Sequence, residues 1–173
     1  MGSPISVPSV KINRDRWVNA SLSGRAFVLT TDVISISGTT ESDFLYVKNP
    51  SGSGKSARLW EIVYSVGVGV GTQRSTARAY RGPTVTSNGT PVSIINTNSD
   101  IQNDSVLRAY TNPTVSNRGS LIQSIQLVNG NYDRMLWMAR MINEGASVLF
   151  TFKPSGTNID HSVFMSWAEE PNP

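Results

Sequence analysis

The chain has 173 residues, and 15 lysines and arginines against 12 aspartates and glutamates give it a formal net charge of +3, with the single histidine neutral. This length suits one domain whose core needs no metal or disulfide to hold it together. The sequence contains no cysteine, which excludes disulfides, thiolate zinc sites, iron–sulfur clusters and cysteine nucleophiles. The basic residues form no run, so we expect no nucleic-acid partner.

The composition predicts an all-β protein. Charged residues make up 16% of the chain, well below the roughly 25% of an ordinary globular domain. Leucine is scarce beside valine and isoleucine, and β-branched residues favour pleated, half-buried strands. No long window keeps the helical spacing of apolar residues, so we expect little helix. The uncharged, valine-rich stretch from Ile62 to Gly71 is too short for a membrane helix, and no membrane association is expected.

The start of the chain is expected to form an arm outside the β domain. Met1 to Val10 contains two prolines and lacks the basic-then-apolar organisation of a secretory signal. We expect the arm, residues 1–23, to be mostly irregular. Residues 24–173 are then expected to form a single antiparallel β-sandwich domain.

Short segments rich in β-branched and aromatic residues follow one another from Ala26 onward, separated by Gly, Pro and Asn turns. In the longest, Arg58 to Val70, strict alternation places Trp60 and Ile62 on the same face. About ten strands exceed a minimal immunoglobulin fold and suit an eight-stranded jelly roll with extra edge strands. The predicted strands are 26–36, 44–48, 58–70, 74–80, 92–95, 106–110, 121–128, 132–141, 147–152 and 161–167.

The middle of the chain repeats itself with an offset of thirty residues. Each unit reads strand, proline-led turn, glycine turn and strand. We interpret the two units as hairpin-like arms of similar construction within one sandwich. The matching residues are Arg78-Ala79-Tyr80, Pro83-Thr84-Val85 and Gly89 in the first unit, and Arg108-Ala109-Tyr110, Pro113-Thr114-Val115 and Gly119 in the second.

The run NPSGSGKS, residues 49–56, invites comparison with a phosphate-binding loop. That motif requires a glycine five residues before Gly54, where this chain has Asn49. A phosphate-binding loop also opens a helix, whereas a strand-like segment follows Lys55. The run therefore predicts a flexible hairpin loop rather than a nucleotide site.

The remaining candidates for catalysis or metal binding are isolated. His161 is the only histidine, and its neighbour Asp160 would face the opposite side of a strand. Glu169 and Glu170 are expected to be solvated. The loop from Asn96 to Asp104 is rich in oxygen ligands that could hold calcium, but an ordinary Asn/Asp turn cluster is the preferred interpretation. We expect no enzyme activity, no cofactor and no metal site, with a hydrolase built on Ser, Asp and His161 as the alternative.

The tryptophans are the candidates for contacts with other molecules. Trp60, Trp137 and Trp167 lie in strongly apolar strands, where burial in the core is expected. Trp17 differs because it lies in a mixed-charge segment with Arg14 and Arg16. Since Arg and Trp anchor protein interfaces, we take these three residues as the candidate contact with a partner chain. The alternative is that the segment packs along its own sandwich.

Four parts of the chain share a recognisable pattern of strand and turn residues: Tyr46 to Lys55, Leu59-Trp60-Glu61-Ile62, the two Pro-Thr-Val arms, and Trp167-Ala168-Glu169-Glu170-Pro171. Together they resemble small β-rich virion proteins of tailed bacteriophages, in particular capsid decoration or cement proteins. The resemblance covers Ala26 to Pro171 and implies a jelly roll that assembles as a homotrimer. It also implies that the protein clamps neighbouring subunits of a major capsid protein from outside, with an N-terminal arm in contact with the capsid.

From this resemblance we expect a virion structural protein that binds the outer surface of an assembled phage capsid and stabilises it. It would be made in the host cytoplasm and located on the capsid surface. Two alternatives stay open at this point: a receptor- or carbohydrate-binding module of a phage tail or fibre, and a small secreted β-sandwich lectin. Both need aromatics or a calcium site exposed at a loop end.

Overall fold

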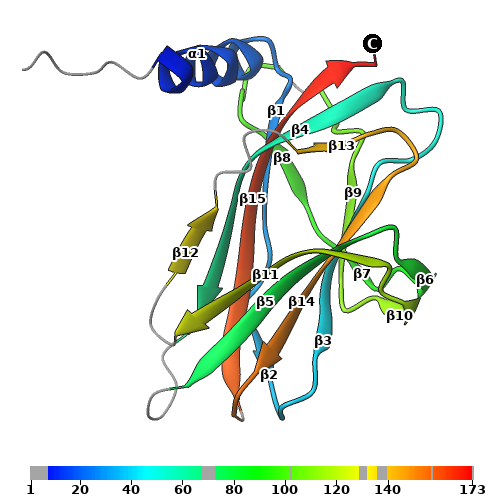
Figure 1. Ribbon diagram of the computed structural model, residues 1–173. Helices are drawn as coiled ribbons and strands as arrows, with labels where there is room; N and C mark the ends of the chain where they lie inside the picture. The colour runs from blue at the N-terminus through cyan, green and yellow to red at the C-terminus, as the bar shows by residue number, and fades with distance from the viewer. Residues whose placement is uncertain are drawn as a thin grey trace, which may run out of the picture.

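A computed structural model describes residues 8–67, 73–101, 103–128, 132–135, 140–156 and 158–172. The described chain forms one helix and a series of antiparallel strands (Figure 1). The helix is α1 (Pro8–Leu22), and the strands are β1 (Ala26–Thr30), β2 (Ile34–Ile36), β3 (Ser42–Lys48), β4 (Lys55–Val66), β5 (Arg74–Arg81), β6 (Thr84–Ser87), β7 (Thr90–Pro91), β8 (Ile94–Asn96), β9 (Arg108–Thr111), β10 (Thr114–Asn117), β11 (Ser120–Val128), β12 (Tyr132–Met135), β13 (Met141–Ile142), β14 (Ser147–Pro154) and β15 (Ile159–Pro171).

The strands form two main sheets whose order is that of a jelly roll. One sheet has the order β12-β4-β15-β1-β8, in which β4 also pairs with β13 and β15 also pairs with β2, and the other has the order β11-β5-β14-β3-β9-β7. Eight strands, four from each sheet, form the jelly roll, and β8, β9 and β7 extend the edges. The prediction of an antiparallel jelly-roll sandwich with extra edge strands is therefore confirmed.

The core lies between the two sheets and consists of the inward-facing residues of each strand. Aromatic rings dominate it: the Phe44 and Phe152 rings meet edge to face with centroids 4.9 Å apart, and Tyr64 lies between Phe150 and Phe152. Trp167 on β15 is fully buried, as expected from its apolar strand. Burial of such large side chains is the main stabilising contribution.

The repeated arms pair with each other across a local two-fold axis. Thr90 of β7 pairs with Thr111 of β9. The residue thirty positions after Thr90, Ser120 of β11, pairs in the same way with the residue thirty positions before Thr111, Arg81 of β5. Val85 and Val115 pair at the centre, where β6 and β10 form a separate two-stranded sheet. The interpretation of two similar arms is confirmed, and the strands of each arm pair with strands of the other.

The arm expected to be irregular is instead helical over Pro8–Leu22. The prediction failed because the helix has no apolar stripe, so periodicity could not reveal it. Proline is favoured at the first turn of a helix, where its missing N–H has no intrahelical partner to bond. Gly24, at φ +66°, ends the helix. Two backbone hydrogen bonds close its last turn: Arg25 N donates to Ala20 O at 2.8 Å, and Gly24 N donates to Ser21 O at 3.0 Å. No helix of the described residues is long and apolar enough to cross a membrane.

Trp60 does not share the inner face of β4 with Ile62, which corrects the alternation predicted for this strand. The β4–β15 register passes from Glu61↔Ser166 to Leu59↔Trp167, so Trp60 is an extra residue at a β-bulge. Leu59 is buried in its place, and Trp60 lies partly exposed on the outer face. Residues 68–70 of the same predicted strand, and Trp137 of the strand 132–141, lie outside the described residues.

Glu169 is buried rather than solvated, because β15 continues to Pro171 and directs successive side chains to opposite faces. Its carboxylate accepts hydrogen bonds from Ser105 Oγ at 2.6 Å and Val106 N at 2.8 Å, and it lies 3.4 Å from Lys55 Nζ. These bonds tie the last strand to the loop that precedes β9. Glu170 lies on the opposite face and is partly exposed.

Candidate partner interface at the helix–sheet junction

Helix α1 lies at the end of the sandwich where β15 ends (Figure 1). Two of its side chains, Trp17 and Ala20, contact the sandwich there. The Trp17 ring meets the Trp60 ring edge to face, with centroids 5.6 Å apart. Ala20, one turn further on, is buried in a small cluster with Ala26 of β1 and Ala168 of β15. The small alanines let the helix approach the sheet closely, and the bulge supplies the tryptophan that receives Trp17.

Hydrogen bonds from the last residue of β8 and from the loop that follows it fix the C-terminal end of α1. Asn98 Nδ2 donates to Leu22 O at 3.1 Å, and Asn96 Nδ2 donates to Gly24 O at 3.0 Å. Thr97 Oγ1 lies 3.1 Å from Ser21 Oγ. The helix therefore has a defined orientation on the sandwich rather than a single point of contact.

The same loop was the candidate calcium site, and its oxygens are used within the chain. Asn96 Oδ1 accepts the N–H of Asn98 at 2.9 Å, and Asn98 Oδ1 accepts the N–H of Asp100 at 3.0 Å. These are the bonds of consecutive Asx turns. The described residues contain no group of three or more acidic or histidine side chains that could hold a metal ion. The two Asx-turn hydrogen bonds support the interpretation of the loop as a turn cluster.

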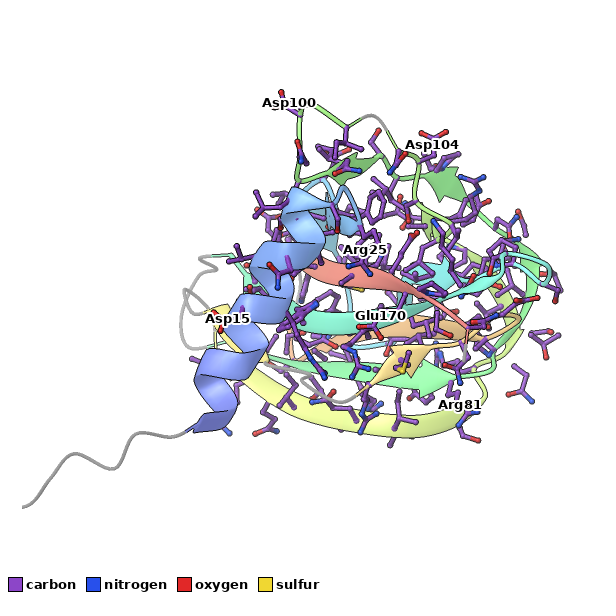
Figure 2. The ribbon with its side chains drawn as sticks, turned by 90° about the horizontal axis from the view of Figure 1, so that it is seen from above. Asp15, Arg25, Arg81, Asp100, Asp104 and Glu170 are labelled. Carbon is purple, nitrogen blue, oxygen red and sulfur yellow. The ribbon has the colours of Figure 1, made fainter. Side chains whose placement is uncertain are left out.

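A pocket of about 310 Å³ lies between α1 and the outer face of β4 and β15. Arg58 donates to Glu170 through Nε at 3.3 Å and through Nη2 at 3.2 Å, in a two-bond carboxylate pair. Arg16 and Arg25 are exposed. Figure 2 shows Arg25 and Glu170 on the same side of α1, with Asp15 on the other side. The pocket is lined by Arg16, Asn19, Ala20, Arg25, Arg58, Trp60, Ala168 and Glu170.

Trp60, one of the residues that line this pocket, carries an unsatisfied donor. The indole Nε1 of Trp60 is buried and has no hydrogen-bond partner among the described residues. A buried donor without a partner costs roughly 1–3 kcal/mol, so such groups are rare and call for an explanation. The junction thus combines three guanidinium groups, one carboxylate and one free indole N–H.

The structure places two of the three predicted contact residues at this junction. Arg16 is exposed and lines the pocket, whereas Trp17 packs on its own sandwich against Trp60. Arg14 lies within α1, and its side chain is outside the described residues. Sequence reasoning missed Arg25, Arg58, Trp60 and Glu170, which come from the α1–β1 connection, from β4 and from β15. No spacing in the sequence links them, and only the strand register brings them together.

His161 is enclosed within the core together with Ser75. Its Nε2 lies 2.8 Å from Ser75 Oγ, and the Phe152 ring lies 4.3 Å from the imidazole. Both residues are essentially inaccessible, with 0% and 1% of their surface exposed. Burial lowers the pKa of His161 to about 4, against weaker opposing effects of the Ile159 backbone and the Asp160 charge. This pair is built as a neutral bridge between the sheets.

The glycine-rich loop between β3 and β4 binds the carboxylate of Glu144 from the same chain. The N–H groups of Gly52 and Gly54 donate to the two carboxylate oxygens of Glu144, at 2.5 and 3.0 Å, and Asn172 Nδ2 donates to the same carboxylate at 2.7 Å. The backbone bonds from Gly52 and Gly54 lower the pKa of Glu144. The expectation of a hairpin loop rather than a nucleotide site agrees with this arrangement.

The fold defines the class of the protein as a jelly-roll β-sandwich. No model of a known protein family matches the chain, and no curated protein matches it. Among solved structures, the mitogen derived from Yersinia pseudotuberculosis is 12% identical with a TM-score of 0.38, over 84% of this chain and 89% of the other. The Kashmir bee virus empty particle at acidic pH is 11% identical with a TM-score of 0.29, over 100% of this chain and 94% of the other. Israeli acute paralysis virus heated to 63 degrees is 12% identical with a TM-score of 0.26, over 86% and 70%.

Proposed function

We propose that this protein is a virion structural protein that binds the outer surface of an assembled phage capsid and stabilises it as a decoration or cement protein. In this proposal it works as a homotrimer, located on the capsid surface, whose partner is the major capsid protein. It has no catalytic role. The helix–sheet junction is the surface through which each subunit contacts the shell.

The observation that carries the proposal is the way α1 is held. Trp17 and Ala20 anchor the helix, while Arg16, Val18 and Leu22 stay exposed, the last two at 45% and 68% of their surface. A helix without its own apolar stripe gains little from lying on the sandwich. Its firm seating, together with exposed apolar and arginine side chains, suits a surface that a partner covers.

The chemistry found elsewhere favours a binding role over catalysis. The single histidine and its serine partner are sealed in the core, where a substrate has no access. Trp167 is also fully buried, and Trp60 faces Trp17, so neither offers the open aromatic platform on which a sugar ring would stack. These features support a shell-binding protein ahead of a carbohydrate-binding module.

The test is cosedimentation of the purified protein with shells assembled from the major capsid protein of the same virus. The full chain should sediment with the shells, and Arg16→Glu should weaken binding because it reverses a charge on an exposed residue without disturbing the seat of the helix. Arg81→Glu is the matched control, since Arg81 is also exposed and lies on the other side of the molecule from α1 (Figure 2).

Two results would overturn the proposal. The first is a full-length protein that stays in the supernatant at micromolar concentration in the presence of intact shells. The second is binding to defined glycans on an array by the same preparation, which would favour a receptor- or carbohydrate-binding module of a tail or fibre.

A further inference from the structure

We propose that the junction pocket is a binding site for a carboxylate side chain, supplied by an acidic segment of the shell protein. This inference rests on the proposed function, because it names the chemical group that the same surface takes from its partner.

The charge of the pocket is the first argument. Three guanidinium groups, of Arg16, Arg25 and Arg58, line it together with one carboxylate, of Glu170. Glu170 is engaged by Arg58 through two hydrogen bonds. Arg25 Nε donates to Ser23 Oγ at 2.9 Å, a neutral acceptor, and no ion pair of Arg16 or Arg25 is found in the described part of the chain. Two positive charges are therefore left for an anion.

A second observation is independent of charge. The Trp60 side chain lines the pocket, and its indole N–H is buried and lacks an acceptor among the described residues. A bound acceptor oxygen that displaces the atoms covering this N–H would satisfy the donor and recover the cost of its burial. Such a contact would distinguish the site from a merely basic surface patch.

The shape and lining favour a carboxylate on an apolar stem over a free phosphate. Ala20, Ala168 and the Trp60 ring form the apolar part of the lining, and the arginines supply the charged part. About 310 Å³ has room for one or two side chains. A glutamate side chain has a short apolar stem and a head that forms two-bond pairs with arginine, as Glu170 already does with Arg58.

The experiment follows the indole N–H signal of Trp60 by ¹H–¹⁵N NMR, assigned with a Trp60→Phe variant, during titration with a hexaglutamate peptide. The signal should move saturably with hexaglutamate and stay in place with hexaglutamine. Arg16→Ala and Arg25→Ala should each weaken the affinity about two- to fivefold, as expected for exposed charge pairs. Arg81→Ala should leave the affinity unchanged, and binding should fall in high salt.

The inference is overturned if hexaglutamate leaves the Trp60 signal in place, or if the shift is unaffected by both arginine substitutions. Inorganic phosphate that moves the signal at equal or lower concentration would also overturn it, in favour of a phosphate site. Failure of the pocket and failure of the proposed function are separable. Shells that bind the protein regardless of added hexaglutamate would refute the pocket alone, and a peptide that binds while shells do not would refute the function alone.

Discussion

The side chains of Ser75 and His161 join the two sheets through a hydrogen bond of 2.8 Å inside the core. Ser75 lies on β5 of one sheet and His161 on β15 of the other. The ring of Phe152 also lies against the imidazole of His161. A charged imidazole in this place would lose its hydration, and the Asp160 charge offsets that loss only in part, so the fold favours the neutral form.

The stability of the protein should fall as the pH is lowered from 7 to 4. Burial lowers the pKa of His161 from 6.5 to about 4, so in this window the unfolded chain binds a proton that the folded chain does not. The contribution is complete above pH 6.5 and is lost as the pH falls towards 4, by about 3 kcal/mol in total. Urea unfolding at several pH values measures it, and a His161→Gln variant should lose most of the slope. Equal slopes in the two proteins would contradict the account.

Gly24→Ala should destabilise the protein and loosen α1. A Cβ at Gly24 would lie 2.4 Å from Ile101 Cγ2, and the φ of +66° disfavours any side chain. The control is Gly38→Ala, where φ is +85° but no atom lies within 4 Å of the added carbon. We expect Gly24→Ala to lower the free energy of unfolding by at least about 1 kcal/mol more than the control. Thermal unfolding checks this, and equal losses would argue against close packing at the junction.

Gly89 and Gly119 should be equally intolerant of a side chain, because the local two-fold axis places them in equivalent positions. A Cβ at Gly89 would lie 2.1 Å from Thr111 O, and one at Gly119 would lie 2.3 Å from Arg81 O. Each substitution by alanine should cost several times as much as Gly82→Ala, whose φ of +67° is similar but whose surroundings are open. Denaturant midpoints of the three variants test the equivalence. A large difference between the first two would contradict it.

A homotrimer is the oligomeric state that the proposed function requires. The edge strand β8 carries Ile95 with 61% of its surface exposed, and exposed apolar edge strands are normally covered or protected. Light scattering at micromolar protein concentration should give three times the mass of the chain. A monomeric mass under these conditions would contradict the homotrimer. In that case Ile95→Lys should leave the measured mass unchanged.

The sequence was sufficient to predict most of the strands because their signals are local. These signals are alternating β-branched residues and Gly, Pro and Asn turns, and the offset of thirty residues predicted two arms of similar construction. The pairing of one arm with the other was not predicted. Helix α1 was missed because its stability comes from two contacts, through Trp17 and Ala20, and from the cap at Gly24. Such tertiary contacts leave no periodic pattern.

The candidate site was only partly predictable. Arg16 and Trp17 stood out as an arginine and a tryptophan in a mixed-charge segment, whereas the other half of the pocket depends on strand register. The bulge that turns Trp60 outward inserts a single residue, and a one-residue shift reverses the face of every side chain beyond it. Glu170 faces Arg58 because those two strands pair side by side.

The most direct test of the central claim is a cryo-electron microscopy reconstruction of shells incubated with the purified protein. We predict density for the sandwich on the outer surface of the shell, in three-fold clusters, with the end that carries α1 against the capsid protein and an acidic side chain of that protein between Arg16 and Arg25. Shells without added density, or sandwiches bound with α1 pointing away from the shell, would contradict the claim.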